Sequence, residues 1–150
     1  MGQRAVHAKR QERLAKTLSL GHEHRVARRS AATSDSQARA RQFAIDVARL
    51  MTDDKCEDIV VLDMADVSGV CDFFVIGTGT SDRQMRAVAD HVEEVGKTRG
   101  ERPFSTAGLT GSSWMVIDYV DVVIHLFDGE ARNFYELETL WGDAPRIEWK

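Results

Sequence analysis

A glycine-rich segment between a predicted strand and a predicted helix has the composition of a phosphate-binding loop. The residues 77–81 (Gly-Thr-Gly-Thr-Ser) are small, and backbone amides at a helix N-terminus attract anions. Arg83 and Arg86 follow and offer positive charge. The segment lacks the third glycine of a dinucleotide-binding loop and the lysine of a P-loop. A tight turn followed by an N-cap is therefore the preferred interpretation.

Paired carboxylates suggest a second chemistry, the binding of Mg²⁺ for phosphoryl or nucleotidyl transfer. Asp63 and Asp66 form one pair, and Asp118 and Asp121 form the other. In a strand, this spacing places the two side chains of a pair on opposite faces unless a turn intervenes. Both pairs are therefore expected to flank strand ends and turns rather than to hold a metal.

The histidines and cysteines give no support for catalysis or for a zinc site. His91 falls on a predicted helix and His125 inside a predicted strand, and the sequence has no G-x-S-x-G nucleophile motif. Cys56 and Cys71 form no C-x-x-C motif, so reduced structural thiols are expected. No metal and no cofactor is predicted.

Aromatic residues are frequent late in the chain and alternate with acids. The aromatics are Trp114, Tyr119, Tyr135, Trp141 and Trp149, and the acids are Asp118, Asp121, Glu136, Glu138 and Asp143. A nucleic-acid platform would combine aromatics with Arg and Lys, whereas acids with aromatics complement a basic protein. About half of these rings are expected in the core. The predicted partner surface is formed by Asp118 and Asp121 beside Trp114.

The elements that position these residues follow from hydrophobic periodicity and capping patterns. We expect helices from about 34 to 53, from 82 to 96 and after Asp128, and strands at 59–62, 73–76, 103–106, 113–119 and 122–127. Only two residues separate the last two strands, so they form an antiparallel hairpin, while the strand–helix–strand order upstream favours parallel neighbours. The prediction is an α/β fold with a mixed sheet of about five strands flanked by helices.

Length and charge suggest one domain preceded by an arm. The chain has 150 residues, and its longest apolar runs have the length of strands, far short of a membrane span. Residues 1–34 carry eight Lys or Arg and two Glu, whereas residues 35–150 have a net charge of −10. We interpret residues 1–34 as a basic arm, either disordered or partly helical, and residues 35–150 as the domain. An organelle transit peptide is the alternative interpretation of the arm.

Three ordered motifs resemble the ribosomal silencing factor, or Iojap, family. They are C-D-F-F-V-I-G-T-G-T-S-D-R-Q at 71–84, W-M-V-I-D-Y-x-D-V-V-I-H at 114–125 and F-Y-x-L-E-x-L-W-G-D-A at 134–144. The resemblance covers about residues 36–147 and leaves the arm outside. It implies a fold related to nucleotidyltransferases but without their catalytic acids.

The resemblance also implies a binding role and no enzymatic activity. Members of the family dock on the large-subunit ribosomal protein numbered fourteen and prevent the small subunit from joining, which represses translation when nutrients are scarce. The implied partner-binding residues here are Trp114, Asp118, Tyr119, Asp121 and His125. Association into a homodimer stays open.

Three alternatives remain beside this hypothesis. The first is a nucleotide-binding or nucleotidyltransferase-like enzyme built around Gly77 to Ser81 with Asp63 or Asp66. The second makes the arm an rRNA-binding element, with Arg10, Arg13, Arg28 and Arg29 as candidate contacts. The third concerns location, which is the bacterial cytoplasm or, if the arm is a transit peptide, an organelle matrix.

Two residues depart from the family pattern. Val120 replaces the glycine usual in the Asp-Tyr-Gly-Asp turn, and a β-branched residue resists positive φ, so a changed turn is expected. Gly129 stands where the family often has proline at the start of the last helix, and this helix should still form.

Overall fold

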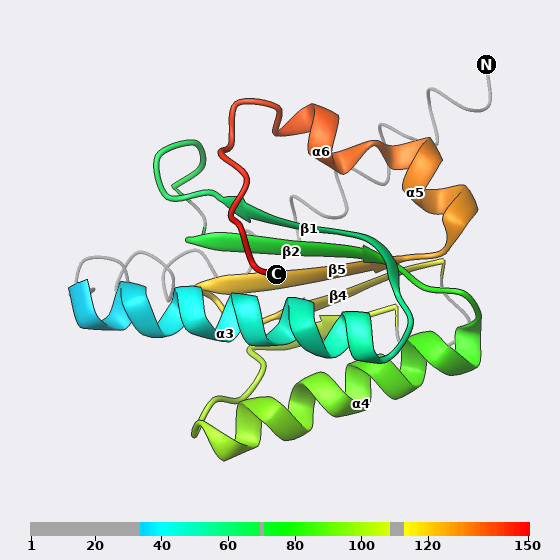
Figure 1. Ribbon diagram of the computed structural model, residues 1–150, viewed down its shortest axis with the longest axis horizontal. Coiled ribbons are helices and arrows are strands. Elements are labelled where there is room, and N and C mark those ends of the chain that lie inside the picture. The colour runs from blue at the N-terminus through cyan, green and yellow to red at the C-terminus, as the bar shows by residue number, and fades with distance from the viewer. Residues whose placement is uncertain (1–33, 70, 109–112) are drawn as a thin grey trace.

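The computed structural model describes residues 34–69, 71–108 and 113–150 (Figure 1). Residues 1–33 of the predicted basic arm lie outside the described residues, together with the candidate RNA contacts Arg10, Arg13, Arg28 and Arg29. Within the described ranges, no helix combines the length and the apolar character needed to cross a membrane.

The described strands form one mixed sheet of five, in the order β1-β2-β5-β4-β3. Their bounds are β1 Glu57–Asp63, β2 Phe73–Thr78, β3 Ser105–Ala107, β4 Trp114–Asp118 and β5 Val122–Phe127. Only β2 and β5 pair in parallel, while the pairs β1–β2, β3–β4 and β4–β5 are antiparallel. The predicted mixed sheet and the predicted hairpin are therefore confirmed, and the short strand near Pro103 lies at a sheet edge as expected. The expectation that the upstream strand–helix–strand unit gives parallel neighbours is wrong, because β3 pairs with β4 and the parallel neighbour of β2 is the later strand β5.

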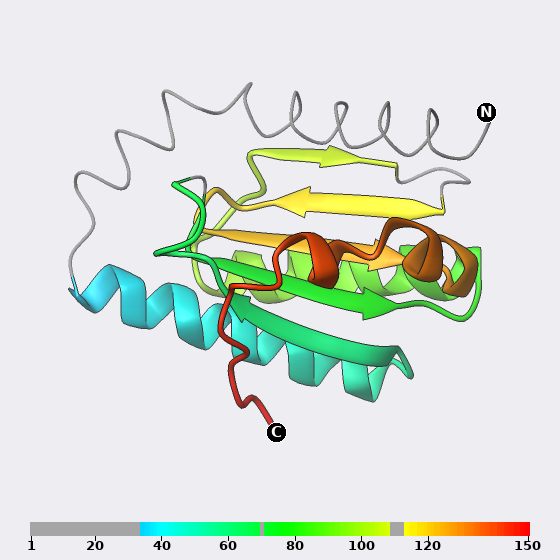
Figure 2. The same ribbon diagram turned by 90° about the horizontal axis from the view of Figure 1, so that it is seen from above.

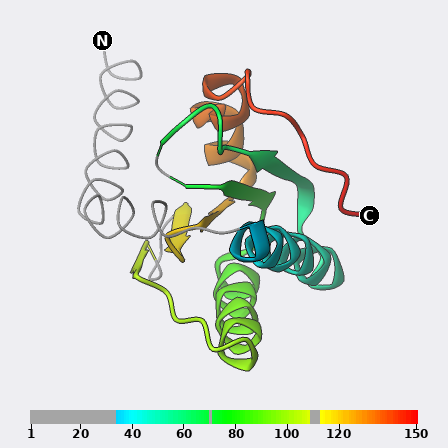
Figure 3. The ribbon, with the colours of Figure 1, turned by 90° about the vertical axis from the view of Figure 1, so that its left-hand side faces the viewer.

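Helices cover both faces of this sheet and enclose two hydrophobic cores. The long helices α3 (Ser34–Asp53) and α4 (Asp82–Thr98) lie on one face, and the short helices α5 (Gly129–Tyr135) and α6 (Leu137–Leu140) lie on the other (Figures 1 and 3). The first core contains apolar residues of α3 and α4, and the second contains those of α5 and α6. A side chain of a strand therefore belongs to one core or the other according to its position in the alternation.

Helix α4 begins as its sequence predicts and ends later. The Ser81 side chain accepts a hydrogen bond from the Gln84 amide at 3.1 Å, which is an N-cap. The Gln84 side chain accepts from the Thr80 amide rather than from that of Ser81, so the capping box is formed one residue off its usual pattern. The helix continues past Gly96 to Thr98. A Cβ at position 96 would lie 2.9 Å from the Tyr119 Oη, so this glycine makes room for the phenol instead of ending the helix.

The single C-terminal helix expected after Asp128 is two short helices. Asp128 caps α5 by accepting from the Ala131 amide at 2.7 Å, as predicted, and α5 begins at Gly129 without proline. Glu136 then has a φ of +47°, in the left-handed region, which ends α5 and redirects the chain into α6.

The C-terminal residues cover the outer edge of β1, which the sequence did not predict. The Asp63 amide donates to the Pro145 carbonyl at 2.8 Å, and the Ile147 amide donates to the Val61 carbonyl at 2.8 Å. Figure 2 shows the tail crossing the sheet and ending beyond β1. This pairing protects an edge strand whose backbone groups would otherwise remain open to another chain.

Candidate docking surface

The five residues predicted to bind a partner do not form one surface. Asp118 and His125 are fully buried, and Tyr119 is 3% exposed. Trp114 and Asp121 are partly exposed, and they lie at opposite ends of the β4–β5 hairpin. The expectation that Asp118 and Asp121 form an exposed acidic pair is therefore wrong for Asp118, because the fold encloses it.

Asp118 instead stabilises the turn of the hairpin. Its Oδ1 accepts a hydrogen bond from the Val120 amide at 2.8 Å, and this bond is buried. The Asp121 amide donates to the Tyr119 carbonyl at 2.9 Å, which makes Val120 the central residue of a γ-turn. Val120 has a φ of +74°, so it adopts the conformation that glycine would allow without strain. Val120 thus adopts a positive φ despite its β-branched side chain, and the buried hydrogen bond to Asp118 helps to hold it in this conformation.

Tyr119 belongs to the core on the side of α3 and α4. Its ring meets the Phe43 ring edge-on, with centroids 4.9 Å apart. Its buried hydroxyl has no hydrogen-bond partner among the described residues. Burial, together with Glu93 and Glu101 nearby, raises the pKa of Tyr119 to about 12. Tyr119 is therefore a packing residue rather than a contact residue.

His125 and Trp114 form a positioned pair on the opposite face. The Trp114 Nε1–H donates to the His125 Nδ1 at 3.2 Å, which requires Nδ1 to be unprotonated. Burial lowers the pKa of His125 to about 3, so the ring is neutral at physiological pH. The buried Nε2 has no hydrogen-bond partner within the described ranges, and the His125 ring lies edge-on to Phe74. His125 thus orients the Trp114 indole from within the core.

The Trp114 indole begins an aromatic surface that extends over α5 and α6. It stacks on Phe127 with centroids 4.9 Å apart and lies 4.6 Å from the Tyr135 ring. Phe134 meets Tyr135 edge-on at 5.1 Å, and Trp141 meets Phe74 at 6.1 Å. Within this region, the half-buried or exposed apolar residues are Trp114, Phe134, Leu140 and Trp141. We call these four residues the aromatic surface.

The segment that carries most of this surface is acidic. Residues 128–143 contain five acids and a single cation, Arg132. Arg132 is buried and is held by an ion pair with Glu138 and a 3.0 Å hydrogen bond to the Thr78 hydroxyl. The acids Glu130, Glu136 and Asp143 are exposed. Apolar rings with exposed carboxylates around them match a basic protein surface.

The loop predicted as either a phosphate cradle or a turn is a packed turn. The Gly79 amide donates to the Phe127 carbonyl at 2.6 Å, and the Thr80 amide donates to the Gln84 Oε1 at 2.8 Å. A Cβ at Gly77 would lie 2.1 Å from the Met51 Cε, and one at Gly79 would lie 2.2 Å from the Met85 Cγ. The glycines thus allow close packing, and the amides of Gly79 and Thr80 are already bonded within the protein.

The carboxylate pairs lie at strand ends and turns, as predicted. Asp63 ends β1, and its Oδ1 accepts from the Ala65 amide at 3.1 Å. Asp66 follows in a turn and is exposed. The part of the chain that the structure describes contains no group of three or more His, Cys, Asp or Glu arranged to hold a metal ion.

Of the four residues of the aromatic surface, only Trp114 was predicted as a site residue. Trp141 was noted among the late aromatics that alternate with acids, whereas Phe134, Leu140 and Trp141 were not predicted to bind a partner. Phe134 is half-buried and its neighbour Tyr135 is buried, and no local pattern marks which of the two rings stays accessible.

Comparisons with known proteins agree with the motifs in the sequence. Residues 37–150 match the family model described as "Ribosomal silencing factor during starvation". The chain is 40% identical over 100 residues to the ribosomal silencing factor of Bacillus subtilis, covering 66% of this chain and 85% of the relative. The factor of Halalkalibacterium halodurans is also 40% identical, over 96 residues, covering 64% of this chain and 82% of the relative.

A solved structure has the same fold. A crystal structure of a Chromobacterium violaceum protein superposes with a TM-score of 0.63 at 30% identity, and the match covers 70% of this chain and 85% of that one. The mixed α/β architecture is therefore shared across the match.

Proposed function

Because the chain belongs to the ribosomal silencing factor family, we propose that it binds the large ribosomal subunit and blocks joining of the small subunit. The observation that carries this proposal is the aromatic surface over α5 and α6 with its acidic surroundings. A bound domain at the intersubunit face would act by occupying space, without any reaction. The proposed partner is the large-subunit ribosomal protein numbered fourteen, in the bacterial cytoplasm.

The predicted partner-binding residues have two different roles in this proposal. Trp114 contacts the partner directly, while His125 holds the indole in its orientation. Asp118 and Tyr119 act indirectly, because they fix the hairpin that carries Trp114. Asp121 remains a candidate contact at the other end of the hairpin.

The test replaces an exposed member of the aromatic surface. Leu140 is 51% exposed, so Leu140→Lys should leave the thermal melt unchanged. Removing an apolar side chain from the interface and placing an ammonium group against a basic partner should weaken binding to isolated large subunits by about 2 kcal/mol, or roughly 30-fold. Pelleting with large subunits measures affinity, and a sucrose gradient measures subunit joining.

Phe104→Lys is the matched control, since Phe104 is 44% exposed beside the distant strand β3. It should bind with unchanged affinity. If Leu140→Lys binds as well as the unaltered protein, or if Phe104→Lys loses as much affinity as Leu140→Lys, the assignment of the docking surface is wrong.

We also propose that the basic arm binds rRNA through its arginines. Replacing Arg10, Arg13, Arg28 and Arg29 by glutamine would remove up to four phosphate interactions. The dependence of log affinity on log salt concentration should then become shallower by about 0.7 to 0.9 for each phosphate that is no longer neutralised. An unchanged slope would show that these arginines do not contact rRNA.

A further inference from the structure

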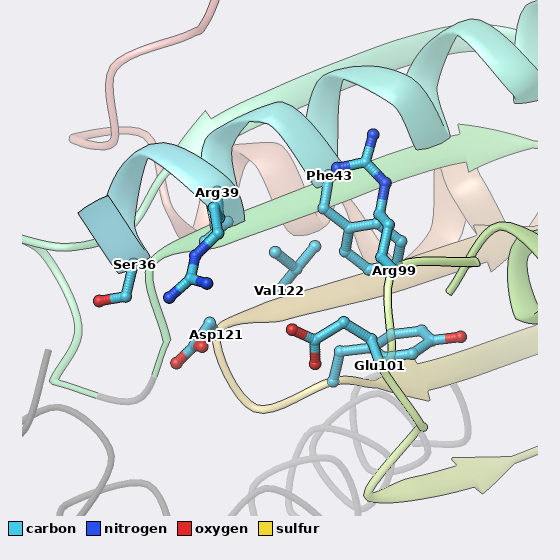
Figure 4. A pocket seen from close by; sticks show the side chains of 9 residues that line it. Ser36, Arg39, Phe43, Arg99, Glu101, Asp121 and Val122 are labelled. Carbon is cyan, nitrogen blue, oxygen red and sulfur yellow. The ribbon is translucent and has the colours of Figure 1, made fainter. Parts of the chain in front are cut away.

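A pocket of about 350 Å³ opens beside the turn of the β4–β5 hairpin (Figure 4). Phe43 of α3 and Val122 of β5 form its apolar floor. Charged side chains line its rim, and they are Arg39, Arg99, Glu101 and Asp121. The pocket lies on the opposite side of the sheet from the aromatic surface, because α3 and the first core border it.

The rim combines two carboxylates with two guanidinium groups, and the two guanidinium groups differ in their contacts. Arg99 forms an ion pair with Asp46 and lies over the Phe43 ring at 5.8 Å, so its charge is already balanced. Arg39 points toward Asp121 in Figure 4, but no ion pair of Arg39 occurs within the described ranges. Because Arg99 is paired with Asp46, the other charged side chains of the rim are two carboxylates and one guanidinium group, which gives a formal charge of one negative unit.

This combination suits an arginine side chain. A guanidinium group donates in a planar fork that matches a carboxylate, and two carboxylates flank this pocket. The methylene groups of the same side chain can lie on Phe43 and Val122. A phosphate group would instead meet two acids and be attracted by Arg39 alone.

We propose that this pocket binds Arg28 or Arg29 of the chain's own basic arm. The arm ends where α3 begins at Ser34, and Ser36 and Arg39 in the first turns of α3 line the pocket. Arg28 lies six positions before Ser34, and six extended steps of the chain reach about 20 Å. Covalent attachment keeps the local concentration of these guanidinium groups high, on the order of mM.

Charge segregation along the chain supports this occupant. Residues 1–34 carry eight Lys or Arg against two Glu, while the domain carries a net charge of −10. A second acidic recess near Asp53 and Glu94 is a weaker candidate, because it lies at the far end of α3 from the arm. Of these two acidic recesses, the pocket beside Asp121 is thus the nearer to the arm.

The proposal goes beyond ribosome binding and can fail independently of it. An arginine held in this pocket is withdrawn from rRNA, so the pocket and rRNA would compete for the arm. Both tests use the free full-length protein without ribosomes. Their outcome does not depend on where the aromatic surface docks.

The first experiment measures protection of the arm from trypsin, which cleaves after Arg28 and Arg29. The pocket variant combines Asp121→Asn with Glu101→Gln, and its cleavage at low salt should be about two- to fivefold faster than that of the unaltered protein, the range expected for exposed ion pairs. Salt at about 0.5 M should remove this difference through screening. Equal cleavage rates of the two proteins at low salt would overturn the proposal.

A matched control carries the same change of charge on the far edge of the sheet. Glu57→Gln with Glu148→Gln alters two exposed acids near β1 and the C-terminal tail. Its cleavage rate should equal that of the unaltered protein. If the control is cleaved as fast as the pocket variant, net charge rather than the pocket protects the arm, and the proposal fails.

The second experiment changes the arm and observes the pocket. In the full-length protein, Arg28→Glu with Arg29→Glu should shift the backbone amide resonances of Phe43, Asp121 and Val122 and leave that of Glu57 in place. Unchanged pocket resonances would overturn the proposal. Arm protection that rises with protein concentration would assign the occupant to a second copy and overturn it as well.

Discussion

The turn end and the open end of the β4–β5 hairpin each carry a residue that the sequence predicts to bind a partner, and the fold uses these two residues differently. At the turn end, Asp118 is fully buried and its side chain accepts a hydrogen bond from the Val120 amide, so this carboxylate stabilises the fold. At the open end, Trp114 is partly exposed and its indole is oriented by the buried His125. Asp121, at the same turn as Asp118, is partly exposed, so residue type alone does not distinguish an enclosed acid from an accessible one. Burial therefore decides which side chains remain available to a partner.

The largest expected loss of stability comes from replacing the buried acid at the turn end. Asp118→Lys removes the acceptor of the Val120 amide and places an ammonium group where no solvent reaches, so the free energy of unfolding should fall by about 3 to 5 kcal/mol. Asp118→Asn keeps an oxygen acceptor and should cost about 1 kcal/mol. Urea unfolding followed by circular dichroism measures both values.

Asp121→Lys is the control for this prediction, because Asp121 is partly exposed at the pocket. It should change the free energy of unfolding by no more than about 0.5 kcal/mol. Equal destabilisation by the two lysine variants would remove the distinction between the two acids.

The next largest effect is a pH-dependent loss of stability caused by His125 at the open end of the hairpin. Burial lowers the pKa of His125 to about 3, whereas an unfolded histidine titrates near 6.5. Between these values the unfolded state binds a proton that the folded state does not, so stability falls as the pH falls from 6.5 toward 3. From pH 7 to pH 5, this contribution should cost about 2 kcal/mol.

His125→Phe lacks this titration and isolates the effect. Both proteins retain His91, whose pKa is raised by its hydrogen bond to Asp54 and which contributes in the opposite direction. Urea unfolding at the two pH values should therefore show a steeper loss for the unaltered protein. The same loss in both proteins would show that His125 is not the titrating group.

The smallest expected difference in stability is between two variants of Val120 in the turn. Val120 combines a φ of +74° with 2% exposure, so burial of its side chain offsets a strained backbone. Val120→Ala loses buried methyl groups and keeps the strain, while Val120→Gly also relieves it. We expect the glycine variant to be more stable than the alanine variant by about 1 kcal/mol. Thermal melts of the two variants measure this difference, and the reverse order would show that the turn is not strained.

Much of the fold follows from interactions between residues close in sequence. The Ser81 cap, the Asp128 cap and the hairpin at 114–127 were predictable because each depends on neighbours within a few positions. The family motifs likewise lie in the sequence itself. The break at Glu136 was not predicted, because its left-handed conformation has no glycine to mark it.

The tertiary structure alone decided which predicted site residues are accessible. Burial of the hairpin turn involves distant residues, since the Asp121 carbonyl accepts from the amides of Asp72 and Phe73 at 2.9 and 3.0 Å. A Cβ at Gly77 would meet the terminal methyl group of Met51, which a helix packed on the sheet brings to it, so this close packing depends on residues distant in the sequence. The sequence by itself determined the elements, their caps and the family, because periodicity and capping are local. Exposure of Trp114, enclosure of Asp118 and the pocket beside Asp121 depend on long-range packing, which no local pattern encodes.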